Sequence, residues 1–285
     1  MIIFHRIEGL KRHLSILKGK GLLIGFVPTM GALHEGHLSL IRNCRSAADV
    51  TVCSIFVNPT QFNDKADFDK YPITTSKDIQ LLIKEDTDIL FLPSVDEIYP
   101  NGISSNQYYD LGYLETILEG AHRPGHFQGV CQVVHRLLDI VEPDRMFLGQ
   151  KDYQQCMVLK KLIELINVPT EIIIANTVRE SSGLAMSSRN LRLSEEEKQK
   201  ATAIYTTLLN IQNSIPSKSL SDIKKESTTT LLNNGFNKID YITIADANTL
   251  HPISNNAELT EEKQLVALIA AFMGEVRLID NMILN

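Results

Sequence analysis

The chain has no tryptophan, no C-x-x-C pair and no excess of basic residues, and these absences exclude several classes of protein. With 28 Lys and Arg against 34 Asp and Glu, its formal charge is −6. Broad electrostatic binding to nucleic acid or to an anionic membrane surface is therefore not expected. No apolar run approaches the ~18 residues of a membrane-spanning helix, and the polar N-terminus does not resemble a signal peptide. We expect a cytoplasmic protein without nucleic-acid or membrane partners.

The four cysteines are scattered and lie among apolar residues. Cys44, Cys53, Cys131 and Cys156 have no spacing typical of a zinc site. They are best interpreted as small buried thiols, and such thiols suit a reducing compartment.

Short apolar runs alternate with helix-period segments in the first part of the chain. Nearly continuous apolar content is typical of parallel strands that are covered on both faces. Strand, helix and strand in succession predict an open parallel α/β sheet with right-handed crossovers. The expected strands are 22–27, 50–57, 88–92, 145–149 and 171–176, and the expected helices are 36–48, 77–85, 127–141 and 153–166.

The pattern changes near residue 178, so we expect two domains, 1–177 and 178–285. A polar connector leads to a helix that starts at Ser194, where Glu197 completes a capping box. Another helix is expected at 219–233. Later strand patterns, at 238–246, 264–273 and 276–284, predict a smaller α+β domain.

Three polar clusters follow expected strands directly. "PTMGALHEGH" follows 22–27, "NPTQF" follows 50–57 and "GQKDYQQ" follows 145–149. Ligands of open parallel sheets bind outside the carboxyl ends of the strands. The three clusters are therefore expected at one edge of one sheet.

His34 and His37 leave three interpretations open. Zinc-protease helices use H-E-x-x-H, whereas these histidines are three apart and no obvious third ligand follows. Alternatively, a glycine-containing turn that opens a helix leaves unpaired N–H groups for phosphate, and two imidazoles one turn apart can add hydrogen bonds. The third interpretation is two incidental surface histidines.

The remaining clusters are ambiguous when each is taken alone. "NPTQF" supplies amides at Asn58 and Gln61, but it also suits a plain turn. "GQKDYQQ" offers Lys151 as a cation for phosphate, but it also suits a solvated helix start. "AMSSRN" offers hydroxyls and Arg189 in a loop that looks mobile. Two roles stay open for His126, which could cap a helix or contact a ligand.

Taken together, "PTMGALHEGH", "NPTQF", "GQKDYQQ", "TVRESSGLAMSSRN", "RPGHFQG" and the terminal "GEVRLIDN" resemble the pantoate–β-alanine ligase family over essentially the whole chain. The resemblance implies a Rossmann-like parallel sheet of the HIGH nucleotidyltransferase superfamily with a smaller α+β C-terminal domain. It implies that domain 1–177 binds ATP and pantoate and that domain 178–285 acts as a lid.

The resemblance also implies the reaction and its participants. Pantoate would attack Mg²⁺-bound ATP to give pantoyl adenylate and pyrophosphate, and β-alanine would then release AMP and form pantothenate. It implies a homodimer. The protein itself is expected to supply no metal ligand set.

Site residues follow from the matched motifs. The resemblance places His34 and His37 on the ATP phosphates, with His37 as general acid, and it adds Lys151 and Arg189 as catalytic cations. Gln61 and Gln155 would hold pantoate. The residues implied to contact ATP are Met30, Gly31, Ala32, Leu33, His34, Glu35, Gly36, His37, Gly149, Gln150, Lys151, Asp152, Val178, Met186, Ser187, Ser188 and Arg189.

Four positions depart from the family pattern. Ile73 and Gln128 stand in place of arginine, Gln150 in place of glutamate and Ser182 in place of aspartate. None of the four is a catalytic position assigned above.

Two other functions stay open. A plain nucleotidyltransferase would move a nucleotide onto a phosphate acceptor, for which more arginines than Gln61 and Gln155 would be expected. A non-catalytic nucleotide-binding module would bind ATP without turnover, and the set of His34, His37, Lys151 and Arg189 argues against it.

Overall fold

The computed structural model describes residues 1–62, 65–103, 107–215, 217–258 and 263–284. The chain divides into two compact units. The first comprises residues 1–150 and 154–176, and the second comprises residues 151–153 and 177–285.

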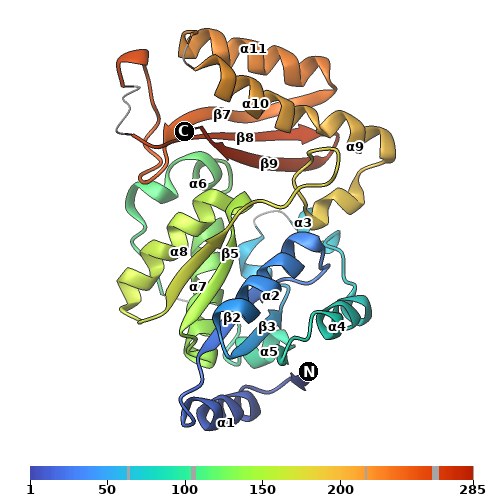
Figure 1. Cartoon of the computed structure of the whole chain (residues 1–285), viewed down its shortest axis with the longest axis vertical. Coiled ribbons are helices and arrows are strands. Elements are labelled where there is room, and N and C mark those ends of the chain that lie inside the picture. Colours follow the sequence, from blue (N-terminus) through green and yellow to red (C-terminus); the bar gives the residue numbers. More distant parts are fainter. Residues whose placement is uncertain (63–64, 104–106, 216, 259–262, 285) are drawn as a thin grey trace. The chain divides into compact units, whose positions relative to one another are not determined.

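A six-stranded parallel sheet forms the centre of the first unit (Figure 1). The order of its strands is β1-β4-β3-β2-β5-β6, and every adjacent pair is parallel. The strands are β1 (Ile2–Phe4), β2 (Ile24–Thr29), β3 (Val50–Ile55), β4 (Ile89–Phe91), β5 (Arg145–Gly149) and β6 (Glu171–Ala175). The predicted parallel sheet is confirmed, and β1 is an edge strand that the sequence analysis did not anticipate.

Helices connect these strands. They are α1 (Ile7–Lys18), α2 (Glu35–Ala47), α3 (Lys65–Asp69), α4 (Thr75–Lys84), α5 (Val95–Ile98), α6 (Leu118–His122), α7 (His126–Val141) and α8 (Tyr153–Ile166). Short 3₁₀ helices lie at Pro59–Gln61 (η1), Gly112–Glu115 (η2) and Gln150–Asp152 (η3). Among the described residues, no helix combines the length and the apolar character that a membrane span requires.

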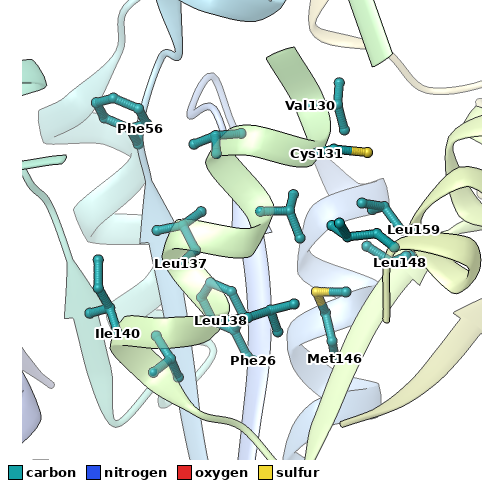
Figure 2. Packing of buried hydrophobic residues seen from close by; sticks show 14 of the residues in the cluster. Phe26, Phe56, Val130, Cys131, Leu137, Leu138, Ile140, Met146, Leu148 and Leu159 are labelled. Atoms are coloured by element: carbon teal, nitrogen blue, oxygen red, sulfur yellow. The ribbon is translucent and has the colours of Figure 1, made fainter. Parts of the chain in front are cut away.

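The sheet is buried on both faces because successive residues of a strand point to opposite sides. Phe26 of β2 and Met146 of β5 belong to a cluster with α1, α7 and α8, whereas Val27 and Phe147, their neighbours in sequence, belong to a cluster with α2 and α4. Figure 2 shows the first cluster, in which side chains of α7 meet those of β2, β5 and α8. This arrangement explains why the strands are continuously apolar.

All four cysteines are buried free thiols, as predicted. Burial raises the pKa of Cys44 to about 11 and that of Cys131 to about 12. These thiols are therefore protonated and unreactive at neutral pH.

The second unit has a three-stranded antiparallel sheet in the order β7-β8-β9. Its elements are a 3₁₀ helix at Ser188–Arg192 (η4), α9 (Glu195–Ala201), α10 (Ala203–Ser214), α11 (Leu220–Asn233), β7 (Phe236–Asp246), a 3₁₀ helix at Asn256–Glu258 (η5), β8 (Leu265–Met273) and β9 (Val276–Ile283). Side chains of α10 and α11 pack with those of the sheet in one hydrophobic cluster. The α+β prediction is confirmed.

The Ser194 capping box is present, since Ser194 and Glu197 exchange two side chain–backbone hydrogen bonds of 2.8 and 3.2 Å. The helix that follows is not continuous, because α9 ends at Ala201 and α10 begins at Ala203.

Glu97 joins the N-terminus of α1 to α5. Its carboxylate accepts hydrogen bonds from the N–H of Ile7 at 2.8 Å and from the guanidinium of Arg6 at 2.7 Å. These bonds hold the pKa of Glu97 below its ordinary value. A carboxylate with a lowered pKa stabilises the fold above the pKa of the unfolded state and loses that contribution as the pH falls through the folded-state pKa.

We therefore expect Glu97→Gln to lower the free energy of unfolding at neutral pH. The difference from the wild type should shrink as the pH falls below about 4.3, the ordinary pKa of glutamate, and should disappear below the lowered pKa of the folded carboxylate. Urea unfolding at several pH values measures it. Glu8→Gln, which removes the exposed pair with Arg12, is the control. A Glu97→Gln difference that stays constant down to about pH 3 would contradict this account.

Candidate active site

The turn after β2 has an unusual backbone. Gly31 and Ala32 both lie in the left-handed region, with φ of 82° and 48°. Glycine adopts this region freely, whereas alanine does so at a cost of about 1–2 kcal/mol. The N–H of Gly31 donates to Thr29 Oγ1 at 3.2 Å, and that hydroxyl donates to the carbonyl of Ser54 on β3. The turn is therefore tied to both strands.

Some main-chain N–H groups of this turn are bound within the chain, and the sequence prediction of unpaired N–H groups is wrong for these. The N–H groups of Ala32 and Leu33 donate to the carboxylate of Asp78 at 3.0 and 2.8 Å. The N–H of His34 faces His37 Nδ1 at 3.4 Å. The N–H groups of Glu35 and Gly36 in the first turn of α2 have no acceptor within the described part of the chain, so a phosphate could be met there by main chain as well as by side chains.

His34 is the N-cap of α2, and His37 lies in its first turn. Their rings are stacked with centroids 4.1 Å apart and planes tilted by 34°. Both side chains are half-buried. The described residues contain no group of three or more His, Cys, Asp or Glu side chains that could hold a metal. The zinc interpretation therefore gains no support.

Three other residues of this motif have side chains that are engaged elsewhere. Ala32 and Leu33 are buried, and Leu33 belongs to the hydrophobic cluster under α2. Glu35 pairs with Arg42, which also binds Glu85 at 2.7 Å. Their predicted contacts with ATP are thus limited largely to main-chain atoms.

Gln61 lies beside the β2 turn. It ends η1, just after β3, and its Nε2 is 2.8 Å from the sulfur of Met30. The amide of Asn58, 1% exposed, donates to Gln61 Oε1 and to the carbonyl of Gly129, both at 3.2 Å. Tyr99 donates to Asn58 Oδ1 at 2.9 Å. The segment that carries Gln61 is therefore held by buried hydrogen bonds.

His126 supports the same segment from α7. A carbonyl can only accept, so His126 Nδ1 donates to the carbonyl of Gln61 at 2.7 Å, and Nε2 then accepts from Arg123 at 3.0 Å. Gly125, not His126, is the N-cap of α7. His126 braces the backbone of Gln61, and no contact with a ligand is needed to explain its burial.

At the end of β5, Gly149 faces open space, because no heavy atom lies within 4 Å of a Cβ built there. A ligand could approach this backbone closely. Gln155 is half-buried on α8. The neighbouring Gln154 is structural, since it accepts from the N–H of Glu119 and donates to the carbonyls of Leu114 and Ile117.

Lys151 belongs to the second unit, whereas the sequence analysis grouped it with the strand ends of the first domain. Its carbonyl accepts from Asn281 Nδ2 of β9 at 2.8 Å, and Tyr153 donates to the carbonyl of Ala247 at 2.7 Å. The Lys151 ammonium is 3.1 Å from Asp152 Oδ1. The residues on either side of Asp152 therefore anchor this segment within the second unit.

A buried ion pair lies next to that anchor. Arg179 binds Asp280 through two hydrogen bonds of 2.5 and 3.0 Å, donates to the carbonyl of Asn281 at 3.4 Å and stacks over the ring of Tyr205 at 4.2 Å. Burial, opposed by Arg179, raises the pKa of Asp280. This network connects the "TVRE" segment to the residue that holds Lys151.

The "AMSSRN" segment is more ordered than a bare loop. The N–H of Met186 donates to the carbonyl of Val178 at 3.0 Å, and Arg179 forms a β-bridge with Ala185. Ser187 caps η4 by accepting from the N–H of Arg189 at 3.2 Å. Motion of this segment stays a prediction.

The four departures have simple structural settings. Gln128 donates to the carboxylate of Glu115 at 3.0 Å and exchanges hydrogen bonds with the main chain of Tyr109. Ile73 is 77% exposed. Gln150 lies in η3, and Ser182 accepts from the N–H of Leu184 at 3.4 Å.

The structure thus gathers the predicted residues into two sets. The first unit brings together the β2 turn, His34, His37 and Gln61. Gly149 ends β5, which lies on the other side of β2 from β3, the strand that η1 follows. The second unit brings together Lys151, Val178 and the 186–189 segment. Asp78 and Asn281 were missed as supporting residues, although Asn281 lies in the terminal motif that had been noticed.

Comparisons with known proteins all point to one family. The family model described as pantoate-beta-alanine ligase matches residues 2–283. Pantothenate synthetase of Fervidobacterium nodosum is 47% identical over 287 residues, covering 100% of both chains, and that of Cytophaga hutchinsonii is 46% identical, covering 100% of this chain and 99% of its own.

Solved structures agree. A pantothenate synthetase from Thermus thermophilus has a TM-score of 0.88 at 36% identity and covers 99% of each chain. A pantoate-beta-alanine ligase from Francisella tularensis, complexed with beta-gamma ATP and beta-alanine, has a TM-score of 0.81 at 39% identity and covers 99% of this chain and 97% of its own.

Gly129 of α7 packs directly against η1. A Cβ at this position would lie 2.2 Å from the carbonyl oxygen of Thr60 and 2.7 Å from Gln61 Cα. We expect Gly129→Ala to lower the free energy of unfolding by about 1–3 kcal/mol. Gly9→Ala in α1 is the matched control, since its Cβ would meet Phe4 at 3.4 Å. This control should be neutral or more stable by up to about 1 kcal/mol. Urea unfolding of both variants measures the difference, and equal effects would contradict the close approach.

Proposed function

Because the chain belongs to the pantoate–β-alanine ligase family, we propose that it condenses pantoate with β-alanine at the expense of ATP, through a pantoyl-adenylate intermediate. The pantoate carboxylate attacks the α-phosphorus of ATP, and the bond to pyrophosphate breaks. The amine of β-alanine then attacks the acyl carbon and loses a proton, and AMP leaves. The observation that carries the proposal is Gln61 beside a turn that presents two stacked histidines at adjacent strand ends.

The first unit supplies the pantoate and phosphate side of the site. Gln61 and Gln155 are neutral, so they can bond the hydroxyl and carboxylate of a hydroxy acid without adding negative charge. His34 and His37 contact the phosphates, and His37 donates a proton as negative charge develops on the departing pyrophosphate.

The second unit supplies cations and most of the nucleotide contacts, and Gly149 and Gln150 of the first unit supply the others. Lys151 and Arg189 offset the repulsion between an anionic acid and a triphosphate. Gly149 and Gln150 line the ATP site, Asp152 binds the ribose, Val178 contacts adenine, and residues 186–189 close over the phosphates and exclude water from the adenylate. Residues 178–285 act in this way as a lid.

Mg²⁺ fits this donor set as an ion bound mainly by the nucleotide. It prefers about six oxygen ligands and in nucleotide sites takes most of them from phosphates and water. The described residues form no cluster of three acidic or imidazole ligands. When bound, the ion would neutralise phosphate charge. A cytoplasmic homodimer completes the proposal, and four free thiols suit that compartment.

One assay tests the reaction. Pyrophosphate release should require pantoate and ATP, and AMP formation should require β-alanine as well. Pyrophosphate release with a phosphate acceptor in place of pantoate would favour a plain nucleotidyltransferase. Binding of ATP with no turnover under any of these conditions would favour a binding module.

His37→Ala and Lys151→Ala should each lower kcat by about 100-fold or more, which is the size expected for lost transition-state stabilisation. Initial rates of pyrophosphate release measure this loss. His122→Ala serves as the control, because this histidine lies on α6 and has no role in the proposal. Turnover near the wild-type rate in either catalytic variant would remove that residue from the mechanism.

Gln61→Ala should mainly raise the KM for pantoate, because it removes a contact that exists before the transition state. The control is Gln107→Ala, which removes an exposed glutamine that has no role in the proposal. Gln154 is not used as the control because its hydrogen bonds are structural. An unchanged KM for pantoate would contradict direct contact.

A further inference from the structure

Asp78 is a buried carboxylate in the first turn of α4, only 1% exposed. Removing a charged carboxylate from water is costly unless the charge is compensated. Its partners therefore indicate what it does. All of them lie at the turn after β2 or one turn before Asp78 itself.

The carboxylate holds the β2 turn with both oxygens. Oδ2 accepts from the N–H of Ala32 at 3.0 Å, and Oδ1 accepts from the N–H of Leu33 at 2.8 Å. The hydroxyl of Thr74 donates to Oδ1 at 3.0 Å. Over the described residues, Asp78 has no ion pair with lysine or arginine. Main-chain N–H groups and one hydroxyl compensate its charge.

The held turn is one that the sequence alone would not favour. Gly31 and Ala32 are successive left-handed residues, and the N–H groups of Ala32 and Leu33 point to the same carboxylate. Neighbouring N–H groups are arranged in a similar way in the anion-binding concavities of phosphate loops. Here the anion is the protein's own carboxylate. A Cβ on Gly31 would lie 3.1 Å from Asp78 Oδ2, so the carboxylate also packs closely against the turn.

The imidazole pair begins immediately after this turn. His34 follows Leu33, and its N–H faces His37 Nδ1. The direction in which α2 starts, and with it the placement of the two stacked rings, depends on the backbone of residues 31–33. Losing one carboxylate bond at the turn would therefore change ring placement without touching the rings.

We propose that Asp78 is a positioning residue for the adenylation step, which fixes the 31–33 turn and thereby aims His34 and His37 at the phosphates of ATP. This inference rests on the proposed function. Asp78 also occupies the N–H groups of Ala32 and Leu33, which a phosphate could otherwise attract.

A pocket of about 230 Å³ adjoins the turn and includes Gly31, Thr74 and Asp78 in its wall. Water can enter a space of this size and bond to exposed donors. A variant of Asp78 could thus hydrate the released N–H groups and still fold, which makes substitution a practical test.

Asp78→Asn keeps the size of the side chain, but its amide nitrogen cannot accept, so one of the two N–H groups loses its partner. We expect kcat for pantoate-dependent pyrophosphate release to fall about tenfold or more, which corresponds to a lost hydrogen bond to a charged group. The KM for pantoate should stay within about threefold, since substrate contacts remain. Amide hydrogen exchange of Ala32 and Leu33 should become faster.

The matched control is Asp88→Asn. Asp88 also accepts a main-chain N–H, that of Thr51 at 2.8 Å, but it does so at the opposite edge of the same sheet. Both variants should lose stability in urea, whereas only Asp78→Asn should lose kcat and protection at residues 32 and 33. Equal kcat values in the two folded variants would overturn the proposal, as would a lower kcat with unchanged exchange at the turn.

Thr74→Val provides the second test if Asp78→Asn fails to fold. It leaves the charge in place but removes the hydroxyl that orients Oδ1. We expect faster exchange at Leu33 and a few-fold lower kcat, and faster exchange with unchanged kcat would overturn the proposal. If the wild type releases no pyrophosphate with pantoate, the proposed function fails, and the exchange measurements still report whether Asp78 holds the turn.

Discussion

Burial of the parallel sheet on both faces is the constraint on which the first unit depends. Phe26 and Val27, adjacent in β2, enter different hydrophobic clusters, and so do Met146 and Phe147 in β5. With helices on both sides, the strands reach solvent mainly at their ends. The β2 turn, η1 and Gly149 all leave from the carboxyl ends of neighbouring strands. The hydrophobic core thus decides where polar chemistry is possible.

At that edge, the polar groups of the chain are largely satisfied by one another. Asp78 holds the turn before α2, Asn58 holds η1, and His126 holds the carbonyl of Gln61. A buried donor without a partner costs about 1–3 kcal/mol, so these bonds keep irregular backbone stable near a ligand site. The side chains proposed to contact substrate at this edge are the two imidazoles and the Gln61 amide. This arrangement differs from a phosphate loop, in which the main chain itself binds the anion.

In the second unit, hydrogen bonds and an ion pair hold the short segment that carries the Lys151 ammonium. Asn281 binds the carbonyl of Lys151, while its neighbour Asp280 pairs with Arg179. Buried ion pairs contribute little net stability, but breaking one leaves an unpaired charge. The network therefore serves chiefly to fix geometry, and it connects Lys151 with the start of the 178–189 segment.

The sequence by itself determined the parallel sheet, the strand ends that carry polar clusters, the α+β character of the C-terminal unit and the Ser194 capping box. These features depend on local periodicity and on residues three or four apart, which a sequence displays directly. Edge strand β1 was missed because its residues are largely exposed and do not show the continuous apolar run of a strand covered on both faces, unlike the equally short β4. The break between α9 and α10 was missed because both helices continue one apolar stripe.

Only the tertiary structure decided which distant residues support the site. Asp78 lies 46 residues from Ala32, and Asn281 lies 130 residues from Lys151. Their contacts depend on strand order, register and helix placement, none of which is encoded in the spacing of a motif. For the same reason, the sequence did not show that the N–H groups of Ala32 and Leu33 are engaged, because the carboxylate that accepts from them belongs to Asp78 on another helix.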